Sequence, residues 1–191
     1  MKTSPSFLVS FLGSLAVVLA ITLSTKDARA LGPIDIEVGA KVGYGTNPIS
    51  NSTVNPLGVG IGARAGIGLF GLYGGLNFVD YLGSGDGAGG TYHAIEFGGE
   101  LGYSLKLSIL TLRPQIGLGN ISFSGATIPT FNSGSLYVEP GGTVLLTFGL
   151  VFIGADANAL IITNAPNASS LGLNTSTQTA FTAHGQIGIA F

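Results

Sequence analysis

The chain has 191 residues, of which 46% are hydrophobic and only 8% are charged, and its formal net charge is −2. This balance excludes a basic surface for nucleic acid, and the lack of cysteine excludes disulfides, thiolate metal sites and a lipidated cysteine. The 32 glycines argue against membrane-spanning helices, because glycine is unfavourable inside a helix. Apolar residues interleaved with glycine favour strands whose apolar side faces lipid.

Residues 1–30 have the features of a secretory signal peptide. Lys2 precedes an apolar stretch from Phe7 to Leu23, and Ala28-Arg29-Ala30 offers a small-x-small cleavage site. We therefore expect cleavage after Ala30, with an uncleaved membrane anchor as the alternative. Residues 31–191 then form a single predicted domain.

Eight segments after residue 30 alternate apolar residues with polar or small ones, which is typical of strands. In the first segment, Ile36, Val38 and Val42 share a face opposite Glu37 and Lys41. The predicted strands are 33–46, 56–70, 71–82, 91–105, 108–120, 135–148, 150–162 and 179–191.

The links between these strands alternate in length. Short turns are expected around Phe70-Gly71, Lys106-Leu107-Ser108 and Phe148-Gly149. The other links are longer and rich in Gly, Asn, Ser and Thr, at 47–55, 83–90, 121–134 and 163–178. Short turns at one rim and long loops at the other predict a transmembrane, antiparallel, up-and-down β-barrel of eight strands.

The charged residues of the predicted barrel fall on the polar face of the strands. Asp80 and Asp86 are the exceptions, and we place them at or beyond the rim beside a long loop. A soluble barrel would need many more surface charges, so we predict that the apolar face meets lipid and the polar face lines the lumen. The charges on the polar face are Asp35, Glu37, Lys41, Arg64, Glu96, Glu100, Lys106, Arg113, Glu139 and Asp156.

An eight-stranded barrel is only wide enough for its side chains to fill the lumen. Charges inside it must therefore pair, because an unpaired buried charge is costly. Lys41, Arg64, Glu100, Arg113 and Asp156 lie at similar heights above the short-turn rim. The predicted lumen ion-pair network comprises Lys41, Arg64, Glu96, Glu100, Arg113, Glu139, Asp156 and His184, with Asn77, Gln115 and Asn158 as neutral neighbours.

Aromatic residues are expected to form a girdle at each membrane interface; random scatter over the apolar face is the alternative. The turn-side girdle would contain Phe70, Tyr103, Phe148, Phe152 and Phe191, and the loop-side girdle Tyr44, Phe78, Tyr81 and Phe181.

The last predicted strand alternates from Phe181 to a terminal Phe191. Such a strand resembles the closing strand of bacterial outer-membrane β-barrels, and residues 31–191 as a whole resemble the small OmpA/OmpX-type barrels. The resemblance implies an outer-membrane location with both termini in the periplasm, contact with outer-membrane lipids, and recognition of Phe191 by the barrel-assembly machinery. It implies a structural or surface-contact role, and we expect a monomer without cofactor, metal or nucleic acid.

Evidence for other chemistry is weak. His93 is predicted to face outward among lipid head groups near the loop rim, where a lipid-modifying barrel enzyme could hold a catalytic histidine. Catalysis there would need a serine and an acid beside His93, and its sequence neighbours offer no His-x-Ser element. We predict a non-enzymatic structural or surface-interaction barrel. A narrow or gated pore for ions or small solutes is the first alternative, and a lipid-modifying enzyme is the second.

Overall fold

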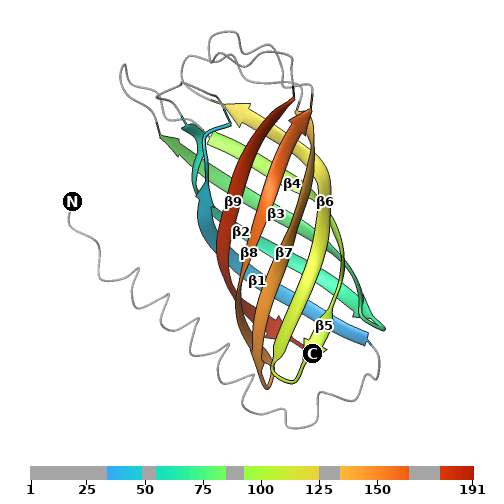
Figure 1. Cartoon of the computed structure of the whole chain (residues 1–191). Coiled ribbons are helices and arrows are strands. Elements are labelled where there is room, and N and C mark those ends of the chain that lie inside the picture. Colours follow the sequence, from blue (N-terminus) through green and yellow to red (C-terminus); the bar gives the residue numbers. More distant parts are fainter. Residues whose placement is uncertain (1–33, 49–54, 85–92, 125–133, 164–176) are drawn as a thin grey trace, which may run out of the picture.

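The computed structural model describes residues 34–48, 55–84, 93–124, 134–163 and 177–191, which form one closed antiparallel β-barrel (Figure 1). The predicted signal peptide and Asp86 lie outside these residues. Within them, no helix is long and apolar enough to cross a membrane. The strands are β1 (Ile34–Gly45), β2 (Asn55–Leu69), β3 (Leu72–Ser84), β4 (His93–Tyr103), β5 (Leu105–Leu107), β6 (Leu110–Ser124), β7 (Ser135–Phe148), β8 (Val151–Thr163) and β9 (Gln178–Ala190).

Strand β5 continues β4 after Ser104, and both pair with β6. The nine segments therefore form the eight strands of the barrel wall, with β4 and β5 as one strand. Each barrel strand is hydrogen-bonded to the strands before and after it in the sequence, and β1 closes the barrel by pairing with β9. At this seam the backbones of Ile36 and Phe191 exchange two hydrogen bonds of 2.7 and 3.0 Å. The predicted eight-stranded, antiparallel, up-and-down barrel is therefore confirmed.

The three short turns lie at one end of the barrel, together with Ile34 and Phe191. We call this the turn end and the opposite end the loop end. Phe70 and Gly71 have φ values of 52° and 87°, the left-handed geometry of the two-residue turn that matches the twist of paired strands. The turn predicted around Lys106-Leu107-Ser108 is displaced to Ser108-Ile109.

The barrel is apolar outside and polar inside. Outward residues such as Ile61 and Leu101 are 58% and 61% exposed, whereas the lumen-facing Arg64 is 2% exposed. An apolar surface of this extent is unfavourable in water and suits lipid. The lumen glycines make room for large side chains, since a Cβ at Gly66 would overlap the ring of Tyr73.

Several placements predicted from the sequence are wrong in detail. Tyr81 and Phe152 are fully buried in the lumen rather than in the girdles. Tyr81 lies on the same face of β3 as Asn77, and Phe152 on the same face of β8 as Asp156, because each pair is an even number of residues apart. Asp80 lies within β3 on the outward face instead of at the rim.

Strand β6 also runs to Ser124, four residues beyond its predicted end at 120. Ile121 and Phe123 are buried in the lumen, and the alternation that places them there extends the strand into the predicted loop.

Candidate functional site

The turn half of the lumen holds two arginines on a single carboxylate. Glu37 of β1 accepts hydrogen bonds at Oε2 from Arg64 Nη2 and Arg113 Nη1, both at 2.9 Å, and at Oε1 from Arg113 Nη2 at 2.5 Å. All three side chains are buried. The pairing of Arg113 with Glu37 is bidentate, which is the strong geometry for an arginine and a carboxylate.

The ring of Tyr73 completes this arginine cluster, defined as Glu37, Arg64, Tyr73, Arg113 and Gln186. The guanidinium carbon of Arg113 lies 3.7 Å from the ring centroid and that of Arg64 lies 5.0 Å away, which are distances of cation–π attraction. Arg64 Nη1 also donates to Gln186 Oε1 at 2.8 Å. The cluster thus ties β1, β2, β3, β6 and β9 together across the lumen.

Above the arginine cluster, Lys41 lies among acids and amides from several strands. Its Nζ is 3.2 Å from Asp156 Oδ2 and 4.0 Å from Glu100 Oε1, and it donates to Asn77 Oδ1 at 3.0 Å. His184 Nδ1 lies 2.8 Å from Asp156 Oδ1. The ammonium of Lys41 therefore has two carboxylates as counter-charges, although Glu100 Oε2 is buried without a hydrogen-bond partner.

Further hydrogen bonds lead from the partners of Lys41 toward the loop end. Asn77 Nδ2 donates to Glu96 Oε1 at 2.8 Å. Tyr81 Oη lies 3.0 Å from His184 Nε2 and donates to Glu96 Oε2 at 3.4 Å. The lysine cluster comprises Lys41, Asn77, Tyr81, Glu96, Glu100, Asp156 and His184.

The loop half of the lumen is closed by apolar side chains, which we call the apolar plug. All of its members are at most 2% exposed, and they come from the loop-end portions of the strands. The plug consists of Leu57, Val79, Tyr81, Ala94, Ile121, Phe123, Tyr137, Leu160, Ile162 and Ala180. The sequence analysis did not predict the apolar plug. The consecutive residues Leu160-Ile161-Ile162 could have indicated it, because three apolar residues in a row make both faces of a strand apolar.

The structure brings together only part of the predicted network. Lys41, Glu96, Glu100, Asp156 and His184 meet in the lysine cluster. The two arginines instead share Glu37, which was predicted to lie on the polar face but was not included in the predicted ion-pair network.

The remaining predicted members also have other partners. Glu139 Oε1 accepts from Thr182 Oγ1 at 2.8 Å, and Gln115 Oε1 accepts from Thr143 Oγ1 at 2.9 Å. Asn158 Nδ2 does reach Asp156 Oδ1, at 3.1 Å. Strand tilt explains these changes, because side chains at equal distance along two strands do not lie at equal height in a closed, sheared barrel.

Comparison with known proteins adds evidence on the fold. No family model matches the sequence, and no curated protein matches it either. The crystal structure of Neisserial surface protein A (NspA) superposes with a TM-score of 0.50 at 12% identity, covering 83% of this chain and 96% of that chain. The chain has the fold of a small eight-stranded outer-membrane β-barrel.

A second solved structure, Ail, the attachment invasion locus protein of Yersinia pestis, gives a TM-score of 0.48 at 9% identity, covering 83% of this chain and 97% of that chain. At such identities the likeness extends to the fold alone. The candidate site must therefore be judged from this chain's own residues.

The described residues contain no group of three or more His, Asp and Glu side chains that could hold a metal ion. On the outward face, His93 Nδ1 lies 3.7 Å from Asp80 Oδ1. Ser124 is directly opposite His93 in the β4–β6 register. An acid and a serine thus both lie beside His93, a proximity that the sequence did not reveal.

Proposed function

We propose that this protein is a non-enzymatic barrel of the bacterial outer membrane with a structural or surface-interaction role. The observation that carries the proposal is the filled lumen, in which the arginine cluster, the lysine cluster and the apolar plug succeed one another from the turn end to the loop end. A filled barrel presents its outer surface and rims, rather than a passage, to other molecules. NspA is named as a surface protein, which agrees with such a role.

The filled lumen predicts poor conduction. The purified protein in a planar lipid bilayer should carry no steady current above that of a protein-free bilayer containing the same detergent. The reason is that an ion would have to cross the apolar plug without hydration. A large, steady single-channel current would instead place the narrow-pore alternative first.

The proposal also predicts orientation, with the loop end outside the cell and the turn end in the periplasm. The chain has no cysteine, so single cysteines can report the two ends. A membrane-impermeant maleimide should label Ser84→Cys, at the loop end, in intact cells. It should label Leu150→Cys, in a turn, only after the outer membrane is opened. The reverse pattern of labelling would overturn this orientation.

A further inference from the structure

We propose that the lumen contains a buried proton-binding site, formed by Asp156, His184, Tyr81 and Glu96, which holds one proton that the unfolded chain gives up. We call these four residues the proton site. They come from β8, β9, β3 and β4, so the site exists only when these strands have closed around the lumen. The inference goes beyond the proposed function, which needs only a filled lumen.

The four side chains make three polar contacts in a row. His184 Nδ1 lies 2.8 Å from Asp156 Oδ1, and His184 Nε2 lies 3.0 Å from Tyr81 Oη. Tyr81 Oη in turn lies 3.4 Å from Glu96 Oε2. All four residues are at most 4% exposed, so bulk water does not replace a hydrogen bond that is lost there.

Each of these contacts needs one proton between its two heavy atoms. A neutral histidine carries one ring proton and a tyrosine hydroxyl carries one, so the two side chains supply only two protons for three contacts. With both carboxyl groups ionised, one contact would bring two lone pairs together in a buried position, which is costly. All three contacts become hydrogen bonds when the proton site holds one further proton.

Asp156 is the acceptor at one end of the proton site. It accepts hydrogen bonds from Asn158 Nδ2 at 3.1 Å and Gln186 Nε2 at 3.4 Å, and Lys41 Nζ lies 3.2 Å from its Oδ2. A carboxylate surrounded by donors in this way is stabilised in its ionised form. His184 Nδ1–H therefore donates to Asp156, and the extra proton lies farther along the row.

The extra proton has two places, one on each side of Tyr81. If both ring nitrogens of His184 are protonated, His184 donates to Tyr81 and Tyr81 donates to Glu96. If Glu96 is protonated, it donates to Tyr81, and Tyr81 donates to His184. The two arrangements differ in the direction of the Tyr81 hydroxyl, and both contain the same number of protons.

The charges around the proton site favour an added proton. Among the described residues, Glu96 and Glu139 are the buried carboxyl groups that have no cation in ion-pair contact. Their partners are neutral. Glu96 is hydrogen-bonded to Asn77 Nδ2 at 2.8 Å and to the Tyr137 hydroxyl, and Glu139 to Thr182 Oγ1 at 2.8 Å. A proton at the site reduces this excess of buried negative charge.

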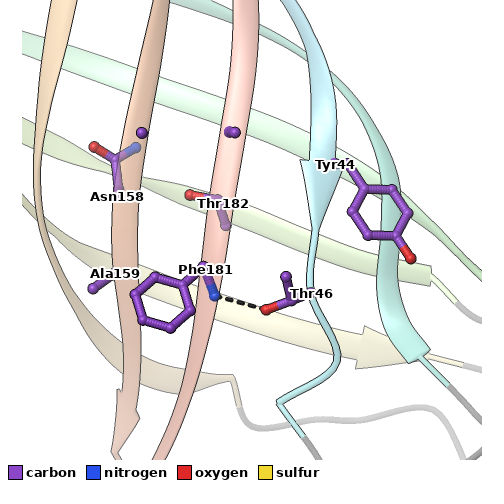
Figure 2. A pocket seen from close by; sticks show the side chains of 8 residues that line it. Tyr44, Thr46, Asn158, Ala159, Phe181 and Thr182 are labelled. Atoms are coloured by element: carbon purple, nitrogen blue, oxygen red, sulfur yellow. Dashed lines mark hydrogen bonds between the residues drawn. The ribbon is translucent and has the colours of Figure 1, made fainter.

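The barrel wall beside the proton site supplies no counter-charge from outside. Asn158 of β8 and Thr182 of β9 lie opposite each other in the sheet, next to an outward groove of about 440 Å³ beside Phe181 (Figure 2). None of the residues that line this groove is charged. The charge at the proton site must therefore be balanced inside the lumen.

The proton site also joins the apolar plug to the polar half of the lumen. Tyr81 and Tyr137 are members of the plug, and the hydroxyls of both are hydrogen-bonded to Glu96. Loss of the extra proton would break a contact of Tyr81 and weaken its attachment to His184. The folded barrel should therefore become less stable when the proton is removed.

The test is the pH dependence of folding, measured by urea titration of the refolded barrel in detergent micelles. An unfolded histidine loses its proton with a pKa of about 6.5, whereas the folded proton site keeps it. Above about pH 6.5 the folded state thus binds one more proton than the unfolded state, and the equilibrium constant for folding should fall about tenfold per pH unit. Below about pH 6.5 both states bind the proton, and this dependence should vanish.

The variants are compared in a His93→Gln background, because His93 is the other histidine of the protein and faces Asp80. Glu96→Gln carries an amide N–H where the extra proton would lie, so its folding constant should stay level as the pH rises. Glu100→Gln is the matched control, since Glu100 is a buried acid 4.0 Å from Lys41 and outside the proton site. It should keep the tenfold fall per pH unit.

Three results would overturn the inference: a folding constant that stays level with pH in the His93→Gln background, an unchanged slope in Glu96→Gln, or an equal loss of slope in Glu100→Gln. The last result would assign the proton to the lumen charges as a whole rather than to the proton site. Bilayer conduction tests the filled lumen separately, so failure of the proton site leaves the proposed function standing.

Discussion

Replacing Glu37 with alanine should lower the free energy of unfolding by about 3–5 kcal/mol, because it leaves two buried arginines without their shared carboxylate. Urea titration of the refolded barrel in detergent micelles, followed by the shift between folded and heat-denatured bands on a gel, would measure this. No other acid is in ion-pair contact with either arginine among the described residues. Unfolding curves of Glu37→Ala and wild type that overlay would mean that water solvates the arginines.

Three further variants set the scale of this loss of stability. Arg113→Ala should cost less, about 1–3 kcal/mol, because Glu37 keeps Arg64 as a partner. Lys106→Ala removes an exposed pair with Asp35 and should cost at most about 1 kcal/mol. Replacing all three charged groups together, as Glu37→Leu with Arg64→Met and Arg113→Met, should recover much of the loss, since an apolar trio leaves no buried charge unpaired.

Phe191→Ala should lower the amount of barrel in the outer membrane several-fold while refolding into detergent changes little. The resemblance of the closing strand to that of outer-membrane barrels implies that the assembly machinery reads this aromatic residue. The two backbone hydrogen bonds between Phe191 and Ile36 do not involve the ring and should survive the substitution. Membrane fractionation and refolding yields, compared side by side, would check both halves of this prediction.

Phe148→Ala is the matched control for Phe191→Ala. Phe148 lies at the same end of the barrel and is 56% exposed, against 40% for Phe191. Both substitutions therefore remove a lipid-facing ring at the turn end, but only one lies in the closing strand. Equal outer-membrane yields of Phe191→Ala and wild type, or an equal loss with Phe148→Ala, would contradict a signalling role for the terminal residue.

The sequence by itself determined the strands, the turn end and the two faces of the barrel. These features are local: alternation with a period of two places neighbouring side chains on opposite faces wherever the strand later lies. Glu37, Lys41 and Arg64 could therefore be placed in the lumen, and Ile61 and Leu101 on the outside, before any partner was known.

Only the tertiary structure decided which side chains meet. Glu37 binds Arg113, 76 residues away, because tilt and closure of the sheet bring β1 and β6 into contact through the lumen. The same geometry brings the residues of the apolar plug together from strand ends that are apolar on both faces. It also places Asp80 beside His93 on the outer face of the barrel. Period-two alternation carries no information about the stagger between strands, so the sequence predicted the charged lining but not its pairs.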